Sequence, residues 1–215
     1  MKALDNCYLY GFIDAAYLRS RDPVLVAIQL CRGGADIIQL RAKDWTAEQI
    51  HSVSEKIQPI LANENVLFVV NDHPEIAHAC NADICHLGQE DFFDQNFTHA
   101  RQLFPQESNC RLGLSTHAPE QARRAIDAEP AYIAIGPVYA TSTKPTAKPV
   151  TLDYVSWARQ HAKIPWFAIG GVNRRTIDDV LAAGAKRVCV VSDILEASDL
   201  EEACRFFKTK LNSIR

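Results

Sequence analysis

The chain has 215 residues, of which 47% are hydrophobic, and its formal net charge is −3. This length and composition fit a single domain over residues 1–215, which should bury about 70% of the surface that the unfolded chain exposes. The slightly acidic balance gives no general attraction for nucleic acid or for an anionic membrane. Apolar runs such as residues 66–70 are far too short to span a bilayer. We therefore expect a cytoplasmic protein whose partners are small molecules, and a homo-oligomer is compatible with the sequence.

The seven cysteines are an odd number and include no C-x-x-C pair. Most lie among apolar neighbours, and residues 1–6 lack the apolar segment of a signal peptide. Both features favour reduced thiols in a cytoplasm over disulfides. His78, Cys80, Cys85 and His86 are an alternative zinc set, but their spacing matches no standard zinc motif.

Short β-rich runs alternate with segments of helical spacing along the chain. The predicted strands are Tyr8–Ile13, Asp36–Leu40, Leu67–Asn71, Ile84–Leu87, Arg111–Ser115, Tyr132–Gly136, Trp166–Ile169 and Arg187–Ser192. The predicted helices are Pro23–Arg32, Thr46–Ala62, Pro74–Cys80, Asn96–Phe104, Pro119–Ala128, Leu152–His161, Arg174–Ala183 and Asp199–Lys210. Eight such units favour an α/β fold, a single (β/α)₈ TIM barrel. An open doubly wound sheet is the alternative, but no G-x-G-x-x-G follows the first strand.

Polar side chains gather at the carboxyl ends of the early strands, the end where barrels carry their active sites. Strand alternation puts Gln39, Arg41 and Lys43 on one side, where they favour a multiply charged anion. A solvated loop with surface ion pairs is the alternative. Asp72 and Asp91 follow the third and fourth strands and predict a shared Mg²⁺, because this ion takes one or two carboxylates together with water and phosphate. The alternative role of Asp72 is a helix cap.

The later strands end in hydroxyl-bearing residues and glycines. Ser115 can donate a hydrogen bond to a phosphate oxygen, and His117 is either an acid/base or an orienting group. The Thr- and Pro-rich loop around Lys144 either closes on phosphate or is a generic loop. Gly170–Gly171 and Ser192 end the last two strands, where barrels commonly bind phosphate. A plain strand-to-helix turn is the alternative there.

Seven motifs occur in order along the chain. They are Gln39-Leu-Arg41-x-Lys43-Asp44, Asn71-Asp72, His86-x-Gly-Gln89-Glu90-Asp91, Gly113-x-Ser115-Thr116-His117, Gly136-Pro-x-x-x-Thr141-x-Thr143-Lys144, Ile169-Gly170-Gly171 and Val191-Ser192. Together they resemble the thiamin phosphate synthase family over about residues 8–192. The resemblance implies a Mg²⁺-dependent transferase that joins an aminopyrimidine diphosphate to a thiazole phosphate and releases pyrophosphate.

The resemblance also implies a role for each matching residue. The pyrimidine diphosphate would be bound by Gln39, Arg41, Lys43, Asn71, Ser115 and Lys144. Catalysis would fall to Arg41, Lys43, Ser115 and Lys144. Mg²⁺ would be held by Asp72 and Asp91. The thiazole phosphate would be bound by Thr141, Ser142, Thr143, Gly171, Val191 and Ser192.

Two positions depart from the family pattern. The stretch before the sixth helix reads Lys148-Pro-Val-Thr151, where the family usually has a glycine, and this change bears on loop closure. Asp193 brings a negative charge near the phosphate pocket unless its side chain turns away. A related thiazole tautomerase and a non-catalytic phosphate-ligand sensor are the alternative functions. A tautomerase has no diphosphate to hold, so the cationic set and the two carboxylates favour the synthase.

Overall fold

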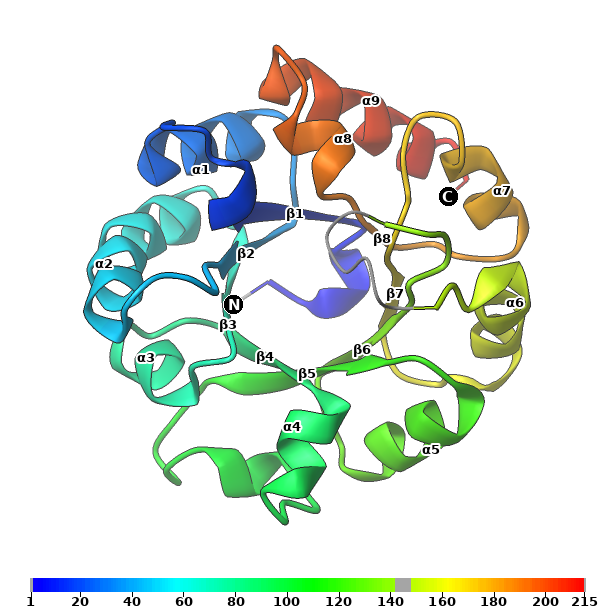
Figure 1. Ribbon diagram of the computed structural model, residues 1–215, viewed down its shortest axis with the longest axis horizontal. Helices are drawn as coiled ribbons and strands as arrows, with labels where there is room; N and C mark the ends of the chain where they lie inside the picture. The colour runs from blue at the N-terminus through cyan, green and yellow to red at the C-terminus, as the bar shows by residue number, and fades with distance from the viewer. Residues whose placement is uncertain (1, 142–147, 215) are drawn as a thin grey trace.

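The computed structural model of the chain describes residues 2–141 and 148–214. Its eight strands form a closed parallel barrel in chain order, and β1 closes the ring by pairing with β8. Figure 1 shows this ring with the helices around it. The strands are β1 (Leu9–Asp14), β2 (Ile37–Arg41), β3 (Leu67–Asn71), β4 (Ile84–Gly88), β5 (Arg111–Thr116), β6 (Tyr132–Ile135), β7 (Trp166–Ala168) and β8 (Val188–Cys189). The predicted (β/α)₈ barrel is confirmed.

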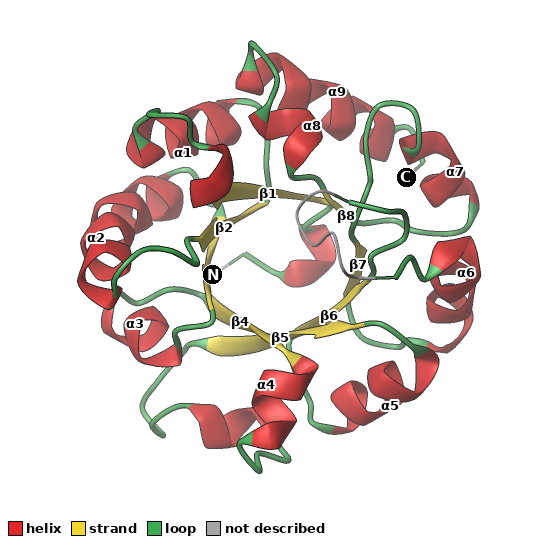
Figure 2. Cartoon of the chain, viewed as in Figure 1, coloured by secondary structure: helices red, strands yellow, loops and turns green. Residues whose placement is uncertain are grey.

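The helices form an outer ring, drawn in red in Figure 2. They are α1 (Pro23–Arg32), α2 (Ala47–Asn63), α3 (Pro74–Ala79), α4 (Gln89–Asp94), α5 (Pro119–Asp127), α6 (Thr151–His161), α7 (Ile177–Ala182), α8 (Ser192–Leu195) and α9 (Leu200–Asn212). Within the described residues, no helix has both the length and the apolar character needed to cross a membrane.

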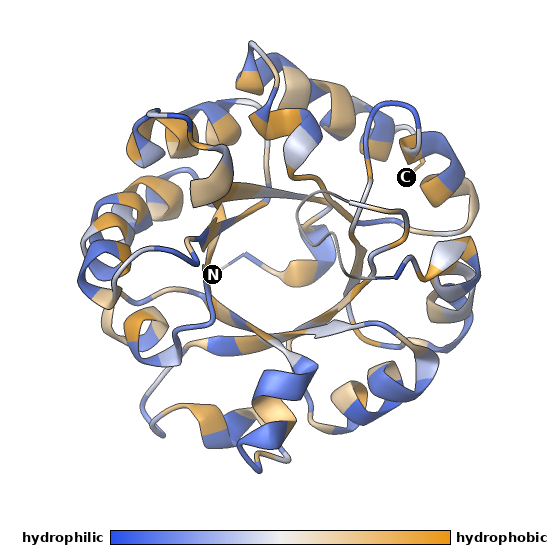
Figure 3. Cartoon of the chain, viewed as in Figure 1, coloured by the Kyte–Doolittle hydropathy of each residue, from blue (hydrophilic) through white to orange (hydrophobic). Residues whose placement is uncertain are grey.

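Local sequence explains why these elements form. Every residue of β1 and β6 is buried, as expected for strands enclosed by a barrel core on one side and helices on the other. Figure 3 shows that the surrounding helices carry both polar and apolar residues. In α2, Ile50, Ile57 and Leu61 are buried at helical spacing, and Thr46 and Gln49 form a capping box at its start.

Three predicted elements are wrong in extent. The last strand, expected over Arg187–Ser192, covers only Val188–Cys189, and Ser192 begins α8. The helix expected over 96–104 is replaced by α4, which starts seven residues earlier in the chain, and by a 3₁₀ helix at Ala100–Leu103. The helix expected from Arg174 starts only at Ile177, because the Asn173 carboxamide oxygen accepts the backbone N–H groups of Arg175 and Thr176 at 2.9 and 3.2 Å. Such local side-chain bonds hold the backbone in a turn and compete with helix.

The barrel end at which the strands begin is closed by the N-terminal segment. A 3₁₀ helix at Leu4–Asn6 lies within the outline of the ring in Figure 1. Asp36 ties this end together, because its carboxylate accepts hydrogen bonds from the Tyr8 backbone N–H, Lys2 and Lys208. Burial raises the pKa of Asp36, but these hydrogen bonds outweigh it and bring the pKa below its ordinary value.

Candidate active site

A cavity opens at the carboxyl ends of the strands, with a volume of about 1080 Å³ that includes open solvent at its mouth. Every described residue of the predicted site lines it, namely Gln39, Arg41, Lys43, Asn71, Asp72, Asp91, Ser115, Thr141, Gly171, Val191 and Ser192. Ser142, Thr143 and Lys144 lie outside the described residues.

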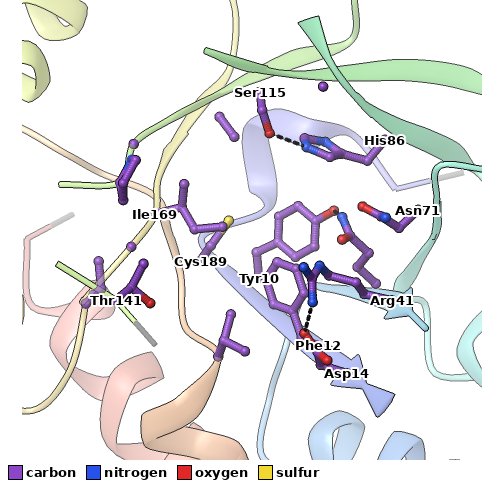
Figure 4. A pocket seen from close by; sticks show the side chains of 18 of the residues that line it. Tyr10, Phe12, Asp14, Arg41, Asn71, His86, Ser115, Thr141, Ile169 and Cys189 are labelled. Carbon is purple, nitrogen blue, oxygen red and sulfur yellow. Dashed lines mark hydrogen bonds and ion pairs between the residues drawn. The ribbon is translucent and has the colours of Figure 1, made fainter. Parts of the chain in front are cut away.

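The cationic wall of the cavity comes from β2. Gln39 and Arg41 project inward as the strand alternation predicts, and Arg41 Nη1 donates to Asp14 Oδ2 at 2.7 Å (Figure 4). Asp14 ends β1 and is 1% exposed, so this ion pair is largely removed from solvent. A guanidinium has five N–H donors, so pairing through one of them is compatible with binding an anion through others. Lys43 Nζ is 3.9 Å from Asp72 Oδ2 in a more exposed pair, which contributes little stability.

The two carboxylates predicted to bind Mg²⁺ reach the cavity from different elements. Asp72 follows β3 with φ +65°, in the left-handed region that Asp tolerates better than most residues. Asp91 follows β4 as predicted, but it lies within a helix, in the first turn of α4. Its carboxylate is so close to Gly88 that a Cβ there would come within 2.6 Å of Asp91 Oδ2. A glycine at the end of β4 therefore leaves the space that this carboxylate occupies.

A chain of hydrogen bonds crosses the cavity floor from β2 to β5. Gln39 Nε2 donates to the Tyr10 hydroxyl at 2.6 Å, and the Tyr10 and Tyr132 hydroxyls are 2.8 Å apart. Tyr132 Oη is 2.8 Å from His86 Nδ1, and His86 Nε2 is 2.8 Å from Ser115 Oγ. Figure 4 shows the imidazole of His86 directed at Ser115. Burial raises the pKa of both Tyr10 and Tyr132 well above the ordinary value, so both are neutral phenols.

The opposite wall is built from backbone and hydroxyl groups after β6, β7 and β8. Gly170 and Gly171 have φ +92° and +67°, and a Cβ on Gly171 would come within 2.6 Å of Tyr139 Cβ. Only glycine suits this turn, because the conformation is left-handed and the loop after β6 packs directly against it. Thr141 and Ser192 line the same wall.

His117 has an orienting contact in this structure. Its Nδ1 hydrogen-bonds the Gly136 carbonyl oxygen, and its backbone N–H donates to Gln121 Oε1 at 2.7 Å. Since a carbonyl oxygen only accepts, Nδ1 carries the proton. Of the two predicted roles, this contact favours the histidine that orients a neighbour, because it holds the end of β6 beside the end of β5.

Asp193 turns away from the cavity. Its Oδ2 accepts the Arg174 backbone N–H at 3.3 Å and is 3.8 Å from Arg174 Nε, and Arg174 also pairs with Glu202 at 2.8 Å. The residues that line the cavity include Ser192 but not Asp193. The negative charge that departs from the family pattern is thus directed to Arg174 and not to the predicted phosphate pocket.

The other departure from the family pattern, the stretch Lys148-Pro-Val-Thr151, lies where the loop after β6 returns to the barrel. The Val150 backbone N–H donates to the Pro137 carbonyl at 2.8 Å, and that of Thr151 donates to Val138 at 3.2 Å. Thr151 begins α6 with φ +62°. A β-branched residue is unfavourable in this left-handed conformation, and a glycine would adopt it freely.

Thr151→Gly is therefore expected to raise the free energy of unfolding by about 0.5–1 kcal/mol, since relief of left-handed strain exceeds the added flexibility of the unfolded chain. Chemical denaturation monitored by circular dichroism measures the change. Asn96→Gly is the matched control, because Asn96 has a similar φ of +64° but a side chain that tolerates it. The change also removes the 3.3 Å hydrogen bond from the Asp153 backbone N–H to Thr151 Oγ1. A Thr151→Gly variant less stable than the parent would contradict the expectation that relief of strain is the larger effect.

Sequence reasoning missed several residues of the site. Asp14 was not singled out, although a carboxylate that ends a buried strand is the same type of pattern that identified Asp72. Tyr10 and Tyr132 read as ordinary core aromatics, because nothing local indicates that their hydroxyls meet 122 positions apart in the chain. His86 was considered only as part of the alternative zinc set, and the family resemblance gave it no role.

The closed barrel and the cavity at the carboxyl ends of its strands define the class of the protein: it is a (β/α)₈-barrel enzyme. Within this class, the chain belongs to the thiamine monophosphate synthase family, whose family model matches residues 9–194.

Individual relatives agree with this assignment. A thiamine-phosphate synthase of Thermus thermophilus is 40% identical over 183 residues, which cover 85% of each chain. That of Lawsonia intracellularis is 39% identical over 193 residues, covering 89% of this chain and 87% of the relative. A solved thiamine phosphate pyrophosphorylase from Pyrococcus furiosus superposes with a TM-score of 0.87 at 24% identity over 99% of both chains, a likeness of fold.

Proposed function

We propose that the chain is a thiamine-phosphate synthase. It would join 4-amino-2-methyl-5-(diphosphooxymethyl)pyrimidine to a thiazole phosphate, releasing pyrophosphate and forming thiamin phosphate. The observation that carries this proposal is one cavity with two unlike walls: Gln39, Arg41 and the carboxylates on the β2–β4 side, and Gly171 and Ser192 on the β7–β8 side. A diphosphate and a monophosphate substrate would each have a matching wall. The relatives described above bear synthase names, and none of them supports the tautomerase or sensor alternatives.

The residues of the cationic wall suit the departure of pyrophosphate. As the bond to the methylene carbon breaks, the pyrimidine is left as a cation that its 4-amino group stabilises, and the thiazole nitrogen then forms the new C–N bond. Negative charge grows on the leaving group, so cations held beside it in advance lower the barrier. Charges ~4 Å apart interact by about 4 kcal/mol at an effective dielectric of 20, against about 1 kcal/mol in water. We assign this role to Arg41, Lys43 and Lys144, with Ser115 as a hydrogen-bond donor.

Asp72 and Asp91 suit a Mg²⁺ ion that takes its other ligands from water and substrate better than a metal ion whose ligands all come from the protein. Both are oxygen donors that line the cavity, and the described residues contain no group of three or more His, Cys, Asp or Glu that could hold a metal. Mg²⁺ usually takes one or two carboxylates and completes its shell with water and substrate phosphate. When bound, it would neutralise charge on the diphosphate.

The thiazole phosphate is assigned to the opposite wall, after β6, β7 and β8. The thiazole phosphate would meet Thr141, Ser142, Thr143, Gly171, Val191 and Ser192. A cytoplasmic location is supported by the cysteines, since all seven are free thiols. A homo-oligomer stays a prediction.

Purified full-length chain, incubated with both substrates and Mg²⁺, is expected to form thiamin phosphate and pyrophosphate in equal amounts, measured by liquid chromatography and mass spectrometry. Pyrophosphate with Mg²⁺ should also raise the melting temperature, because the diphosphate wall binds it. A tautomerase would isomerise the thiazole phosphate without joining it to the pyrimidine. The melting temperature of a monophosphate sensor would not change with pyrophosphate. Folded protein that binds both substrates but forms no product would contradict the proposal.

A further inference from the structure

In the hydrogen-bond chain across the cavity floor, each group donates to the next one, from Gln39 toward Ser115. The donor at each step follows from the chemistry of the group before it. The Gln39 amide nitrogen can only donate, so the Tyr10 oxygen accepts from it. Tyr10 is a neutral phenol with one proton, which it directs to the Tyr132 oxygen 2.8 Å away. Tyr132 in turn directs its single proton to His86 Nδ1 at 2.8 Å.

The direction selects one tautomer of His86. Because Nδ1 accepts from Tyr132, the ring proton is on Nε2, and Nε2 donates to Ser115 Oγ at 2.8 Å. The Ser115 oxygen is then an acceptor on its His86 side. No other hydrogen-bond partner of Ser115 Oγ is found among residues 2–141 and 148–214. Its own proton is therefore available to the cavity that Ser115 lines.

Tyr132 cannot act by touching a ligand. Its side chain is 0% exposed and is absent from the cavity lining, unlike that of Tyr10. It lies edge-on to Phe167, with ring centroids 5.3 Å apart. Its hydroxyl also occupies space that Gly113 leaves open, since a Cβ on Gly113 would be 2.7 Å from Tyr132 Oη. The barrel core thus holds this buried hydroxyl against His86.

We propose that Tyr132 is a positioning residue of this enzyme: through the Nε2–H tautomer of His86, it directs the Ser115 hydroxyl proton toward the substrate. The role rests on the proposed function, in which Ser115 donates to the departing diphosphate. If the chain ran in the opposite direction, Ser115 would donate to His86, and its proton would be unavailable to the substrate. The tautomer of His86 distinguishes the two directions without any catalytic turnover.

The first test is two-bond ¹H–¹⁵N NMR of the histidine rings in the full-length protein, with the His86 signals assigned by their loss in His86→Asn. We expect the Nε2–H tautomer, with Nδ1 showing the shift of an unprotonated, hydrogen-bonded nitrogen, and we expect that shift to change in Tyr132→Phe. An Nδ1–H tautomer in the parent protein would overturn the proposal. This result does not depend on activity, so it is separate from a failure of the proposed function, which would appear as absence of product.

The second test is a double-mutant cycle on kcat. Tyr132→Phe alone should lower kcat roughly tenfold with KM within about twofold, as expected for one lost hydrogen bond in the transition state. In a Ser115→Ala background, the same Tyr132→Phe change should alter kcat less than about twofold, because the group it positions is gone. Independent effects of the two changes would show that Tyr132 only supports the fold.

Tyr154→Phe is the matched control. Tyr154 is also a buried tyrosine, and its hydroxyl bonds Thr116 Oγ1 and the Ala118 carbonyl at 2.8 Å each, outside the cavity lining. The Tyr154→Phe change removes a phenol oxygen, as Tyr132→Phe does, and with it a comparable buried hydrogen bond. It should leave kcat and the His86 signals unchanged; a fall equal to that of Tyr132→Phe would show a general effect of core damage and overturn the specific role.

Discussion

Arg41→Gln is expected to destabilise the fold by about 3 kcal/mol and to lower kcat by roughly 10³-fold. The stability loss arises because Asp14 is 1% exposed, and its buried carboxylate would lose the guanidinium that lies 2.7 Å away in the parent protein. The loss of activity arises because Arg41 lines the cavity where we propose that the leaving diphosphate is held. Chemical denaturation measures the first effect, and steady-state kinetics below the melting range measures the second.

The double variant Asp14→Asn/Arg41→Gln separates the two effects. It removes both charges at once, so most of the stability should return, whereas kcat should stay as low as in Arg41→Gln. If activity returned together with stability, Arg41 would serve the fold and not the substrate. If Arg41→Gln were as stable as the parent, the Asp14 carboxylate would have another compensating partner.

Asp72→Asn and Asp91→Asn are each expected to lower kcat by roughly 10²–10³-fold and to raise the Mg²⁺ concentration needed for half-maximal rate. Each change replaces a carboxylate that we propose as a Mg²⁺ ligand with a neutral amide of the same shape, so the fold should be little affected. Activity measured across a Mg²⁺ titration gives both quantities.

Asp94→Asn is the control for this pair. Asp94 ends the same short helix that carries Asp91 and is likewise exposed, but it does not line the cavity. Its replacement should leave the Mg²⁺ dependence unchanged. Parent-like Mg²⁺ dependence in both Asp72→Asn and Asp91→Asn would remove these residues from the proposed metal site.

Several features of the site were predictable because they depend on local periodicity and on chain direction. Alternation along β2 predicted that Gln39 and Arg41 share a side, and both line the cavity. The position of Ser192 at the end of the predicted last strand indicated the carboxyl end of the barrel, and Ser192 lines the cavity there, although it starts a helix and does not end a strand. The position of Asp91 in α4 was not predictable, because the strand-to-helix boundary after β4 depends on packing.

The sequence by itself determined the eight alternating units, the end of the barrel at which polar residues gather and the motifs that identify the family. These depend on spacing within a few residues or on the order of the chain. Only the tertiary structure decided that Arg41 pairs with Asp14, that Asp193 faces Arg174, and that Tyr10 and Tyr132 join Gln39 to Ser115. These contacts join residues that are distant along the chain, and barrel closure brings them together, so no local pattern indicates them.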